Sequence, residues 1–339
     1  MILPDAGLKN PFQYQMIEFL KANHLDVVSG KKHKLFGTLT AVQKSNPDVI
    51  YFDWVHGFIL GKSLLSTIIK SFTFFLEIIY LSHIKQIPLI HTAHNIQNHK
   101  SKFLFIERII YTFFLRHCER IRTYSEAIKS ELSVKFSVSP DKIFVIQDIP
   151  FHHYYPNNTT RKESCLYLDL LERGFFYLFF GRLEPYKGIE NLISAFLSIP
   201  QPDTFLIIAG ESLDSNYLTK LKKISCGCPH IIWFDQFIPP ESIQYFFNAA
   251  DVVVLPFSKI YHSGSIDLSM SFSKPVITCK MSAIAKLLDH QSTLLFERPS
   301  QLATCLLLAK KLNLDKIGKK NFTIADSGNY ADLLSLFRI

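Results

Sequence analysis

A chain of 339 residues exceeds one typical domain and suits two, because single domains usually contain about 100 to 200 residues. Hydrophobic residues make up 48% of the chain and charged residues 19%, which excludes a mainly disordered protein. The net charge is +8, with 18 Lys and Arg against 12 Asp and Glu in residues 1–157, and 19 against 17 in residues 158–339. A basic first half can attract anionic lipid or nucleic acid, or it can be only a solvated surface.

The six cysteines are scattered, and the one close pair, Cys226 and Cys228, is spaced too tightly for a usual zinc site. We therefore expect reduced thiols in a cytoplasmic protein. The N-terminus shows no basic stretch followed by an apolar one, so we expect no signal peptide. The sequence contains no motif of the usual nucleic-acid-binding folds, and we expect no nucleic-acid partner.

In the first half of the chain, short apolar runs alternate with longer stretches of helical pattern. This alternation is typical of parallel strands whose sheet is covered by helices on both faces. After a short strand at the N-terminus, each predicted strand is followed by enough residues for a crossover helix. These strands are residues 49–52, 88–92, 120–124 and 143–146.

Two segments between these strands are unusually apolar. Residues 58–81 include Lys62, Lys70 and Glu77, and these charges argue against a membrane span of about 20 uncharged residues. Residues 103–115 contain one arginine and are followed by three more. Both segments are expected to form helices that pack on the sheet or, as the alternative, that lie on a membrane interface.

The second half repeats this rhythm, with near-continuous apolar runs of the buried parallel type. Residues 148–164, between the halves, are rich in turn formers and contain two prolines, which is typical of a linker. We expect two domains, residues 1–157 and 158–322. The predicted strands of the second half are residues 175–180, 204–209, 231–234, 252–255 and 275–278.

Open sheets of this kind bind ligands beyond the carboxyl ends of their strands. In residues 177–196, YLFFGRLEPYKGIENLISAF, a predicted strand ends at Gly181 and a helix begins near Gly188, with Arg182 and Lys187 between them. A diphosphate needs fixed cations and free backbone N–H groups, and glycines let the backbone approach it closely. The loop is therefore a candidate phosphate site or, alternatively, a solvated charged turn.

This loop is followed by AGES at residues 209–212 and by FDQFIPPESIQYFFNAADVVVLPF at residues 234–257. In order and spacing these segments resemble the donor half of family 4 glycosyltransferases, the group 1 enzymes of bacterial polysaccharide synthesis. The resemblance covers nearly the whole chain and is closest over residues 175–280. It implies the α/β fold called GT-B, in which two Rossmann-like, doubly wound parallel-sheet domains face a central cleft. It also implies a donor-binding role for Glu211 and a closing helix in residues 323–339 that returns to the N-terminal domain.

Residues 262–277, HSGSIDLSMSFSKPVI, predict a helix that begins near Ser263 and Gly264. Its first amides and the Ser265 side chain could hold the donor phosphates, or Ser263 could be only an N-cap.

Many members of the family carry two glutamates eight positions apart in this region, where this chain has Ile260 and Leu268. Resemblance to a subset with Ser-Gly at the turn implies that Asp267 supplies the lost carboxylate. A solvent-facing Asp267 is the alternative.

Residues 88–100, PLIHTAHNIQNHK, place His94 and Asn95 directly after a predicted strand and His99 one helical turn later. The segment resembles the family's Thr-x-His-Asn turn, whose histidine approaches the donor sugar or its β-phosphate. His94 is therefore the first catalytic candidate, with Arg182 and Lys187, while a structural histidine that bridges loops is the alternative.

Two further loops on the same predicted edge resemble acceptor loops of the family. One contains Gly7 and Asn10, and the other contains Trp54, which could stack on a sugar ring or lie in the core. With Asn95 and His99, these residues form the predicted acceptor side. Three other histidines, His91, His152 and His153, show no spacing that singles out a metal site.

The resemblance implies a glycosyltransferase that moves a hexose from a UDP- or GDP-sugar to an acceptor hydroxyl with retention of configuration. It implies no cofactor and no metal ion, because Arg182 and Lys187 would stabilise the departing diphosphate. We expect a saccharide or polyprenyl-diphosphate-linked acceptor, and contact with the anionic inner face of the plasma membrane. Two alternatives stay open: an epimerase on the same fold, and a non-catalytic nucleotide-sugar-binding subunit, which the missing glutamates favour.

Overall fold

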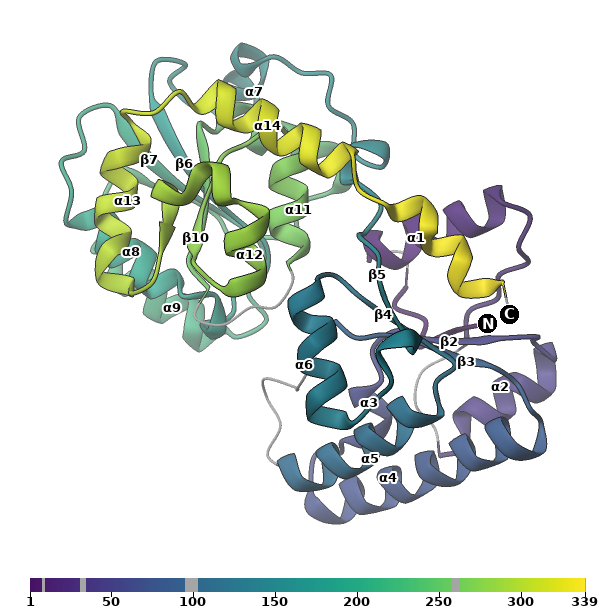
Figure 1. Cartoon of the computed structure of the whole chain (residues 1–339). Helices are drawn as coiled ribbons and strands as arrows, with labels where there is room; N and C mark the ends of the chain where they lie inside the picture. The colour runs from purple at the N-terminus through teal and green to yellow at the C-terminus, as the bar shows by residue number, and fades with distance from the viewer. Residues whose placement is uncertain (8–9, 31–34, 95–102, 258–262, 339) are drawn as a thin grey trace. The chain divides into compact units, whose positions relative to one another are not determined.

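The computed structural model describes residues 1–7, 10–30, 35–94, 103–257 and 263–338, which fold as two compact units (Figure 1). The first unit contains Met1–Ile149 and Asn329–Ile339, and the second contains Pro150–Gly328. These boundaries differ from the expected ones at 157/158 and 322/323. The difference arises because Phe151 and Tyr155 belong to the second hydrophobic core, and the Phe151 amide donates to Ser271 Oγ at 3.0 Å.

The first unit contains a parallel sheet in which the named strands follow in the order β1-β2-β3-β4-β5. An isolated parallel bridge joins Ile2 to Ser29 on the far side of β1. The chain therefore crosses from one side of β1 to the other between Ser29 and β2, which makes the β1/β2 boundary the topological switch point. The strands are β1 (Ile2–Leu3), β2 (Ile50–Phe52), β3 (Leu89–Thr92), β4 (Arg120–Thr123) and β5 (Ile143–Val145).

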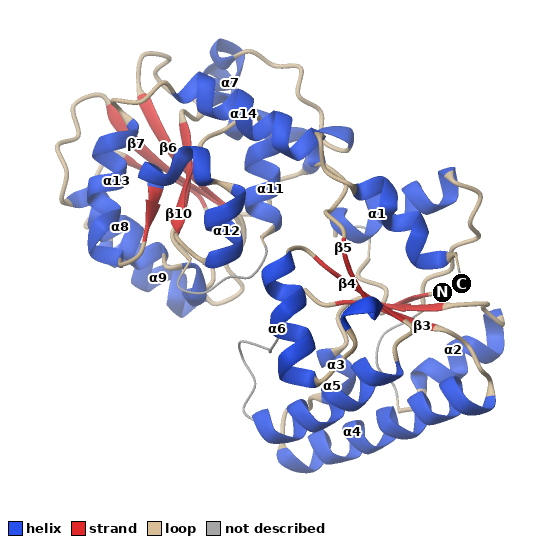
Figure 2. Cartoon of the chain, viewed as in Figure 1, coloured by secondary structure: helices blue, strands red, loops and turns tan. Residues whose placement is uncertain are grey.

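Helices cover both faces of this sheet, as predicted (Figure 2). Alternation along β2 turns Phe52 toward Phe74 and Phe114, with ring centroids 5.9 and 5.2 Å apart. Tyr51 faces the other way and stacks on Phe337 at 5.8 Å. The helices are α1 (Pro11–Ala22), α2 (Gly37–Ser45), α3 (His56–Ile59), α4 (Leu64–Ile79), η1 (Tyr80–Ile84), α5 (Leu104–His117), α6 (Glu126–Phe136), η2 (Pro140–Lys142) and η8 (Tyr330–Phe337).

The C-terminal segment forms two helices where one was expected. Helix α14 (Leu314–Asp326) ends at Ser327, and the 3-10 helix η8 begins after Asn329, whose side-chain amide donates to the Val145 carbonyl at 3.0 Å. Leu333 and Leu336 of η8 are buried in the first core. The chain breaks at this point because the last turns pack on the first unit, whereas α14 packs on the second.

The second unit contains a six-stranded parallel sheet with the order β8-β7-β6-β9-β10-β11, which is the doubly wound order 3-2-1-4-5-6. Its strands are β6 (Phe175–Phe180), β7 (Thr204–Ala209), β8 (Ile231–Phe234), β9 (Val252–Leu255), β10 (Val276–Cys279) and β11 (Leu295–Phe296). The chain reverses direction across the sheet between β6 and β9, so the loops after these two strands flank the switch point, where such sheets bind ligands.

Helices again lie on both faces of the sheet. Tyr177 of β6 contacts Phe196 of α8 and donates to the Leu306 carbonyl of α13, whereas Phe180 contacts Phe247 of α10. The helices are η3 (Phe151–His153), α7 (Arg161–Tyr167), η4 (Pro185–Lys187), α8 (Ile189–Leu197), α9 (Ser215–Ile224), η5 (Pro240–Ser242), α10 (Ile243–Ala249), α11 (Gly264–Ser271), α12 (Ser282–Leu287), η6 (Asp289–Leu294), η7 (Pro299–Gln301), α13 (Leu302–Ala309) and α14.

Candidate functional site

Three predicted residues of the second unit meet directly after β6. Gly181 has a φ of +126°, and a Cβ atom built on it would lie 3.0 Å from Lys187 Nζ and 3.4 Å from Ser265 Oγ. Lys187 ends η4 and Ser265 lies in the first turn of α11, 78 positions later in the chain. The structure therefore brings an ammonium group, a hydroxyl group and an open stretch of backbone together at the sheet's switch point.

Lys187 is a buried cation, with a relative exposure of 8%. Burial lowers the pKa of its amine to about 8; nearby Arg182 also lowers it, while Glu184 opposes the shift. Within the described residues, the Lys187 amine makes no hydrogen bond, and it lies 6.0 Å from the centre of the Phe179 ring. An ammonium group held in this way is stabilised by an anion that enters the site.

Close backbone packing explains why glycines occupy the turns around this lysine. Gly188, the N-cap of α8, has a φ of +71°, and an added Cβ would lie 2.1 Å from the Pro256 carbonyl oxygen. Gly210 has a φ of +145°, and an added Cβ would lie 2.1 Å from the Gly181 carbonyl oxygen. Glycine is the residue that adopts these conformations without a clash. The loops after β6, β7 and β9 are thereby held against one another.

Helix α11 supplies the second half of this site. Ser263 is its N-cap, and the Ser263 side chain accepts a hydrogen bond from the Ser265 amide at 3.3 Å. The Ile266 and Asp267 amides donate to the Ser263 carbonyl at 2.9 and 3.2 Å, which leaves the Gly264 amide without a partner within the helix. The aligned peptide dipoles of α11 give its N-terminus a partial positive charge. Gly264 is exposed and Asp267 is partly buried in the same turn. Helix α11 and Lys187 therefore form a site suited to a phosphate or diphosphate group.

Two further positions that the family resemblance singled out on the donor side lie in the second unit. Glu211 follows β7, is exposed, and its backbone carbonyl accepts a hydrogen bond from the Leu183 amide at 2.9 Å. Leu268, where the family often has a glutamate, is 7% exposed and packs in the second core. Ile260 lies outside the described residues.

In the first unit, His94 lies directly beyond β3 and has partners at both ring nitrogens. Its Nε2 donates to the carboxylate of Asp53, which follows β2, and its Nδ1 lies 2.9 Å from the hydroxyl of Tyr124, which follows β4. The ring stacks on Trp54, with centroids 5.1 Å apart and planes 10° apart. Residues after three neighbouring strands thus orient one imidazole.

Asp53 is fully buried and is itself anchored. Gln13 of α1 donates from Nε2 to Asp53 Oδ2 at 3.3 Å and to the Pro4 carbonyl at 2.9 Å. The edge of the Phe12 ring packs on His94 at 5.0 Å. Asp53 could be suspected from its position after a strand, whereas Gln13 could not, because nothing in the sequence aims a helical glutamine at a residue 40 positions away.

Three of the predicted acceptor residues, Gly7, Asn10 and Trp54, take part in local packing or hydrogen bonding. Gly7 has a φ of +75° and donates to Asp5 Oδ1 at 2.9 Å, and Asn10 is the N-cap of α1. Trp54 is partly buried, and one face of its ring is covered by His94. Asn95 and His99 lie outside the described residues.

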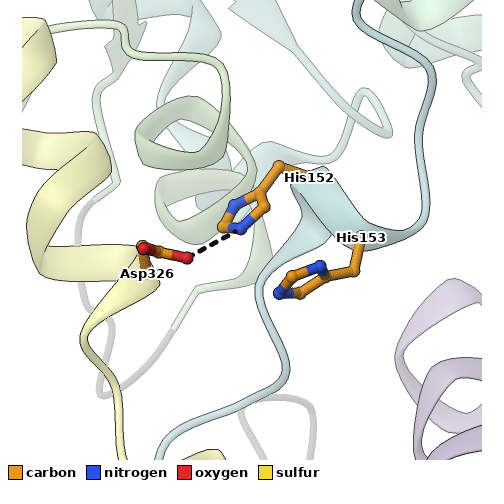
Figure 3. A group of neighbouring side chains, drawn as sticks. All are labelled: His152, His153 and Asp326. Carbon is orange, nitrogen blue, oxygen red and sulfur yellow. Dashed lines mark hydrogen bonds and ion pairs between the residues drawn. The ribbon is translucent and has the colours of Figure 1, made fainter.

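One side-chain group of the second unit could hold a metal ion. His152, His153 and Asp326 have potential ligand atoms within 4.8 Å of one another (Figure 3). His152 Nε2 lies 3.1 Å from Asp326 Oδ1, and burial lowers the pKa of His152, with His153 adding to the shift and Asp326 opposing it. A hydrogen bond accounts for this pair without an ion. The sequence could not reveal the group because Asp326 is 174 positions from His152.

The comparisons with known proteins agree with this geometry. Residues 168–321, which contain the whole of the site around Lys187, match the family described as glycosyl transferases group 1. This part of the chain is a group 1 glycosyl transferase domain. The group 1 domain therefore includes all of the predicted donor-binding residues, and its match ends inside α14.

Two curated relatives extend the match beyond the group 1 domain. An uncharacterized glycosyltransferase of Methanocaldococcus jannaschii is 26% identical over 223 residues, which cover 62% of this chain and 56% of that protein. The chain thus spans little more than half the length of that relative. A GDP-mannose:glycolipid 4-beta-D-mannosyltransferase of Xanthomonas campestris is 21% identical over 287 residues, covering 85% of this chain and 74% of that protein.

Solved structures show the fold of the whole chain. The Anabaena protein HepE, crystallised with UDP, superposes with a TM-score of 0.71 at 17% identity, over 95% of this chain and 89% of that one. WaaG, a glycosyltransferase involved in lipopolysaccharide biosynthesis, superposes with a TM-score of 0.67 at 13% identity, over 98% and 96%. The chain that carries the group 1 domain therefore has the two-domain GT-B fold, as predicted.

Proposed function

We propose that this protein transfers a sugar from a UDP- or GDP-sugar to an acceptor hydroxyl. The observation that carries the proposal is the meeting of Lys187 Nζ and Ser265 Oγ at Gly181, within the group 1 glycosyl transferase domain. A nucleoside diphosphate-sugar carries its negative charge on the diphosphate, which is the leaving group of the transfer. Cations and amides placed where that charge develops lower the barrier to transfer.

Each donor-side group has a distinct part in this proposal. Lys187 and Arg182 neutralise the departing diphosphate, and the N-terminus of α11 with the Ser265 hydroxyl holds its oxygens. These groups would do so without a metal ion. Asp267 takes the place of one of the family's glutamates, and Glu211 serves the donor side. On the first unit, His94 remains the proposed catalytic residue, because Asp53 and Tyr124 orient its ring.

The acceptor in this proposal is a lipid-linked saccharide of cell-surface polysaccharide synthesis, handled at the inner face of the plasma membrane. The name of the Xanthomonas relative, a GDP-mannose:glycolipid mannosyltransferase, supports both a nucleotide-sugar donor and a glycolipid acceptor. The basic excess in residues 1–157 supports contact with anionic lipid.

Retention of the donor's anomeric configuration is part of the proposal, because the family resemblance implies it. The relative's name specifies a beta linkage. The one-bond coupling between C1 and H1 of the transferred sugar, measured by NMR in the product and in the donor, decides between retention and inversion.

A non-catalytic nucleotide-sugar-binding subunit is the second candidate. It is favoured by Leu268, a buried core residue in the place of a family glutamate. Binding of a nucleotide-sugar without transfer to any of a panel of lipid-linked acceptors would support it over the enzyme.

The decisive experiment compares the buried Lys187 with Lys274, a partly buried lysine of the same unit. Lys187→Met removes the amine at the proposed site, while Lys274→Met removes an amine at the amino-terminal edge of the same sheet, where Nζ donates to the Ala250 carbonyl at 2.9 Å. Burial lowers the pKa of both amines to about 8. Thermal shift is measured with UDP, GDP and their sugars, because a ligand that binds the folded state raises its melting temperature.

We expect at least one nucleotide to stabilise the wild type and Lys274→Met, and to have no effect on Lys187→Met. Transfer of sugar from the stabilising donor should fall at least about 100-fold in Lys187→Met. Equal nucleotide stabilisation in both variants would contradict the proposed site.

A further inference from the structure

Helices α4 and α5 carry an unusual number of exposed apolar side chains on their outer faces. Of the 22 exposed large hydrophobic residues in the described chain, ten lie on α4, η1 and α5. Those of the second unit are spread over separate loops and helices. The ten are Leu64, Leu65, Ile68, Ile69, Phe72, Leu76, Ile84, Leu104, Phe105 and Ile109.

Helical spacing places these residues on one side of each helix. Along α4, positions 65, 68, 69, 72 and 76 follow the i, i+3, i+4 pattern of a single stripe. Phe72 is 61% exposed and Phe105 of α5 is 77% exposed. The two helices run side by side, and Phe75 and Phe113 join them with ring centroids 4.4 Å apart (Figure 1).

The opposite side of α4 is part of the folded core. Phe74 and Ile78 are buried against the sheet, and the carboxylate of Glu77 accepts hydrogen bonds from the Thr38 and Leu39 amides at 2.9 and 3.2 Å. Residues 64–84 are long and apolar enough to cross a membrane, yet 39% of their most apolar window is buried in the fold. Crossing would strip Glu77 of these amides, so the arrangement suits a helix that lies on a surface.

The exposed charged side chains of this part of the chain are all basic. Among the described residues between 54 and 117, the exposed Lys and Arg side chains are Lys62, Lys85, Arg108 and Arg116. Both carboxylates of this region are buried: Glu77, and Glu107, which pairs with His56 at 2.9 Å. Apolar side chains bordered by cations alone complement a bilayer with anionic headgroups.

We propose that the outer face of α4 and α5 is a membrane-binding surface that lies parallel to an anionic lipid bilayer. Its apolar stripe enters the boundary between headgroups and acyl chains, and Lys62, Lys85 and Arg108 contact the headgroup phosphates. This inference deepens the proposed function, on which it rests for the idea that the acceptor is lipid-linked. The surface holds the whole enzyme at the membrane, independently of donor binding.

Vesicle flotation of the full-length protein tests the surface. The wild type should float with vesicles of phosphatidylcholine and phosphatidylglycerol, and much less with phosphatidylcholine alone. The double variant Phe72→Gln/Phe105→Gln should bind the mixed vesicles at least about tenfold more weakly, since two large apolar side chains no longer enter the bilayer. The variant Lys62→Glu/Arg108→Glu should lose the preference for phosphatidylglycerol.

The matched control is Leu171→Gln/Leu213→Gln, in which two leucines of the second unit, 72% and 71% exposed, are replaced. This control should bind vesicles as the wild type does. These three double variants should keep the nucleotide-induced thermal shift. Lys187→Met should lose that shift and still float with the vesicles. Failure of the surface and failure of the proposed donor site are thereby separate results.

Three outcomes would overturn the proposal. Unchanged flotation of the aromatic double variant would show that another part of the chain binds lipid. A fall in molecular mass on Phe72→Gln/Phe105→Gln, measured by light scattering without vesicles, would show that the stripe joins two copies of the chain. Release of the membrane-bound wild type by alkaline carbonate is expected, and its retention would show a spanning helix instead.

Discussion

His94 donates a hydrogen bond from Nε2 to the buried carboxylate of Asp53, so the residue that follows β3 is oriented by the residue that follows β2. The two positions are 41 apart in the chain and become neighbours because parallel strands end at the same edge of the sheet. This pair is the polar centre of the first unit's candidate site.

Asp53→Ala should destabilise the protein by about 2–3 kcal/mol, because it leaves the His94 and Gln13 donors without their buried acceptor. Asp53→Asn should lower the free energy of unfolding by less, since its amide oxygen can still accept a hydrogen bond from His94. Some destabilisation should remain, because its amide nitrogen cannot accept the hydrogen bond that Gln13 donates. Urea unfolding measures both changes. At a low temperature, where both variants stay folded, the rate of sugar transfer should still be lower in both than in the wild type. Full activity in a folded Asp53→Ala protein would remove this pair from the mechanism.

Lys187 should make nucleotide affinity depend on pH. Burial sets the pKa of its amine at about 8 in the free protein, and the diphosphate binds the charged form. UDP or GDP affinity should therefore be nearly constant below about pH 7.5 and weaken toward tenfold per pH unit above pH 8. Calorimetric titration at several pH values, in buffers of different ionisation enthalpy, should also detect proton uptake on binding near pH 8. A flat profile to pH 9.5 would be incompatible with this role.

The buried Lys187 amine should also lower the free energy of unfolding of the nucleotide-free protein. Its folded pKa lies below the ordinary lysine value of 10.5, so the unfolded chain binds more protons between about pH 8 and 10.5. The penalty is therefore present in full below pH 8 and fades as the pH rises toward 10.5. Lys187→Met should raise the free energy of unfolding at pH 7 by about 2–3 kcal/mol, and by much less at pH 10. An equal effect at both pH values would point to packing instead of charge.

Gly188→Ala should destabilise the second unit more than a positive φ alone explains. Gly188 and Gly227 have similar φ values, +71° and +65°, but only at Gly188 would a Cβ meet backbone, 2.1 Å from the Pro256 oxygen. Gly227→Ala should cost about 1 kcal/mol, the usual price of a left-handed alanine. Gly188→Ala should cost clearly more and weaken nucleotide binding, as measured by thermal melts with and without UDP. Equal costs would mean that the loop relaxes freely.

Chelation should not affect sugar transfer. In the proposed mechanism Lys187 and Arg182 carry the positive charge that a metal ion supplies elsewhere. Activity in excess EDTA should therefore equal that in Mg²⁺ or Mn²⁺. His152→Ala, which removes a member of the group that could hold an ion, serves as a second readout and should leave activity unchanged. A requirement for metal that EDTA removes would contradict the proposed donor chemistry.

Local pattern was sufficient to predict most strands. Phe175–Phe180, Thr204–Ala209, Ile231–Phe234 and Val252–Leu255 form where they were predicted, because apolar runs of this length are buried on both faces of a parallel sheet. The last of the predicted set is shifted by one residue, to Val276–Cys279. The domain boundary was harder to predict from local pattern. Phe151 and Tyr155 lie in a stretch with the composition of a linker, and only the packing of the second core shows that they belong to the second unit.

Local sequence patterns were sufficient to predict the α/β class, the glycine-bordered loop that holds Arg182 and Lys187, and the start of the helix at Ser263. All of these depend on backbone conformation and short-range hydrogen bonds, which neighbouring residues specify. The three-dimensional fold was needed to show that Lys187 and Ser265 meet at Gly181, that Asp53 and Gln13 support His94, and that α4 and α5 turn apolar side chains outward. Those relationships join residues tens of positions apart, and strand order and helix packing, which local patterns do not encode, bring them together.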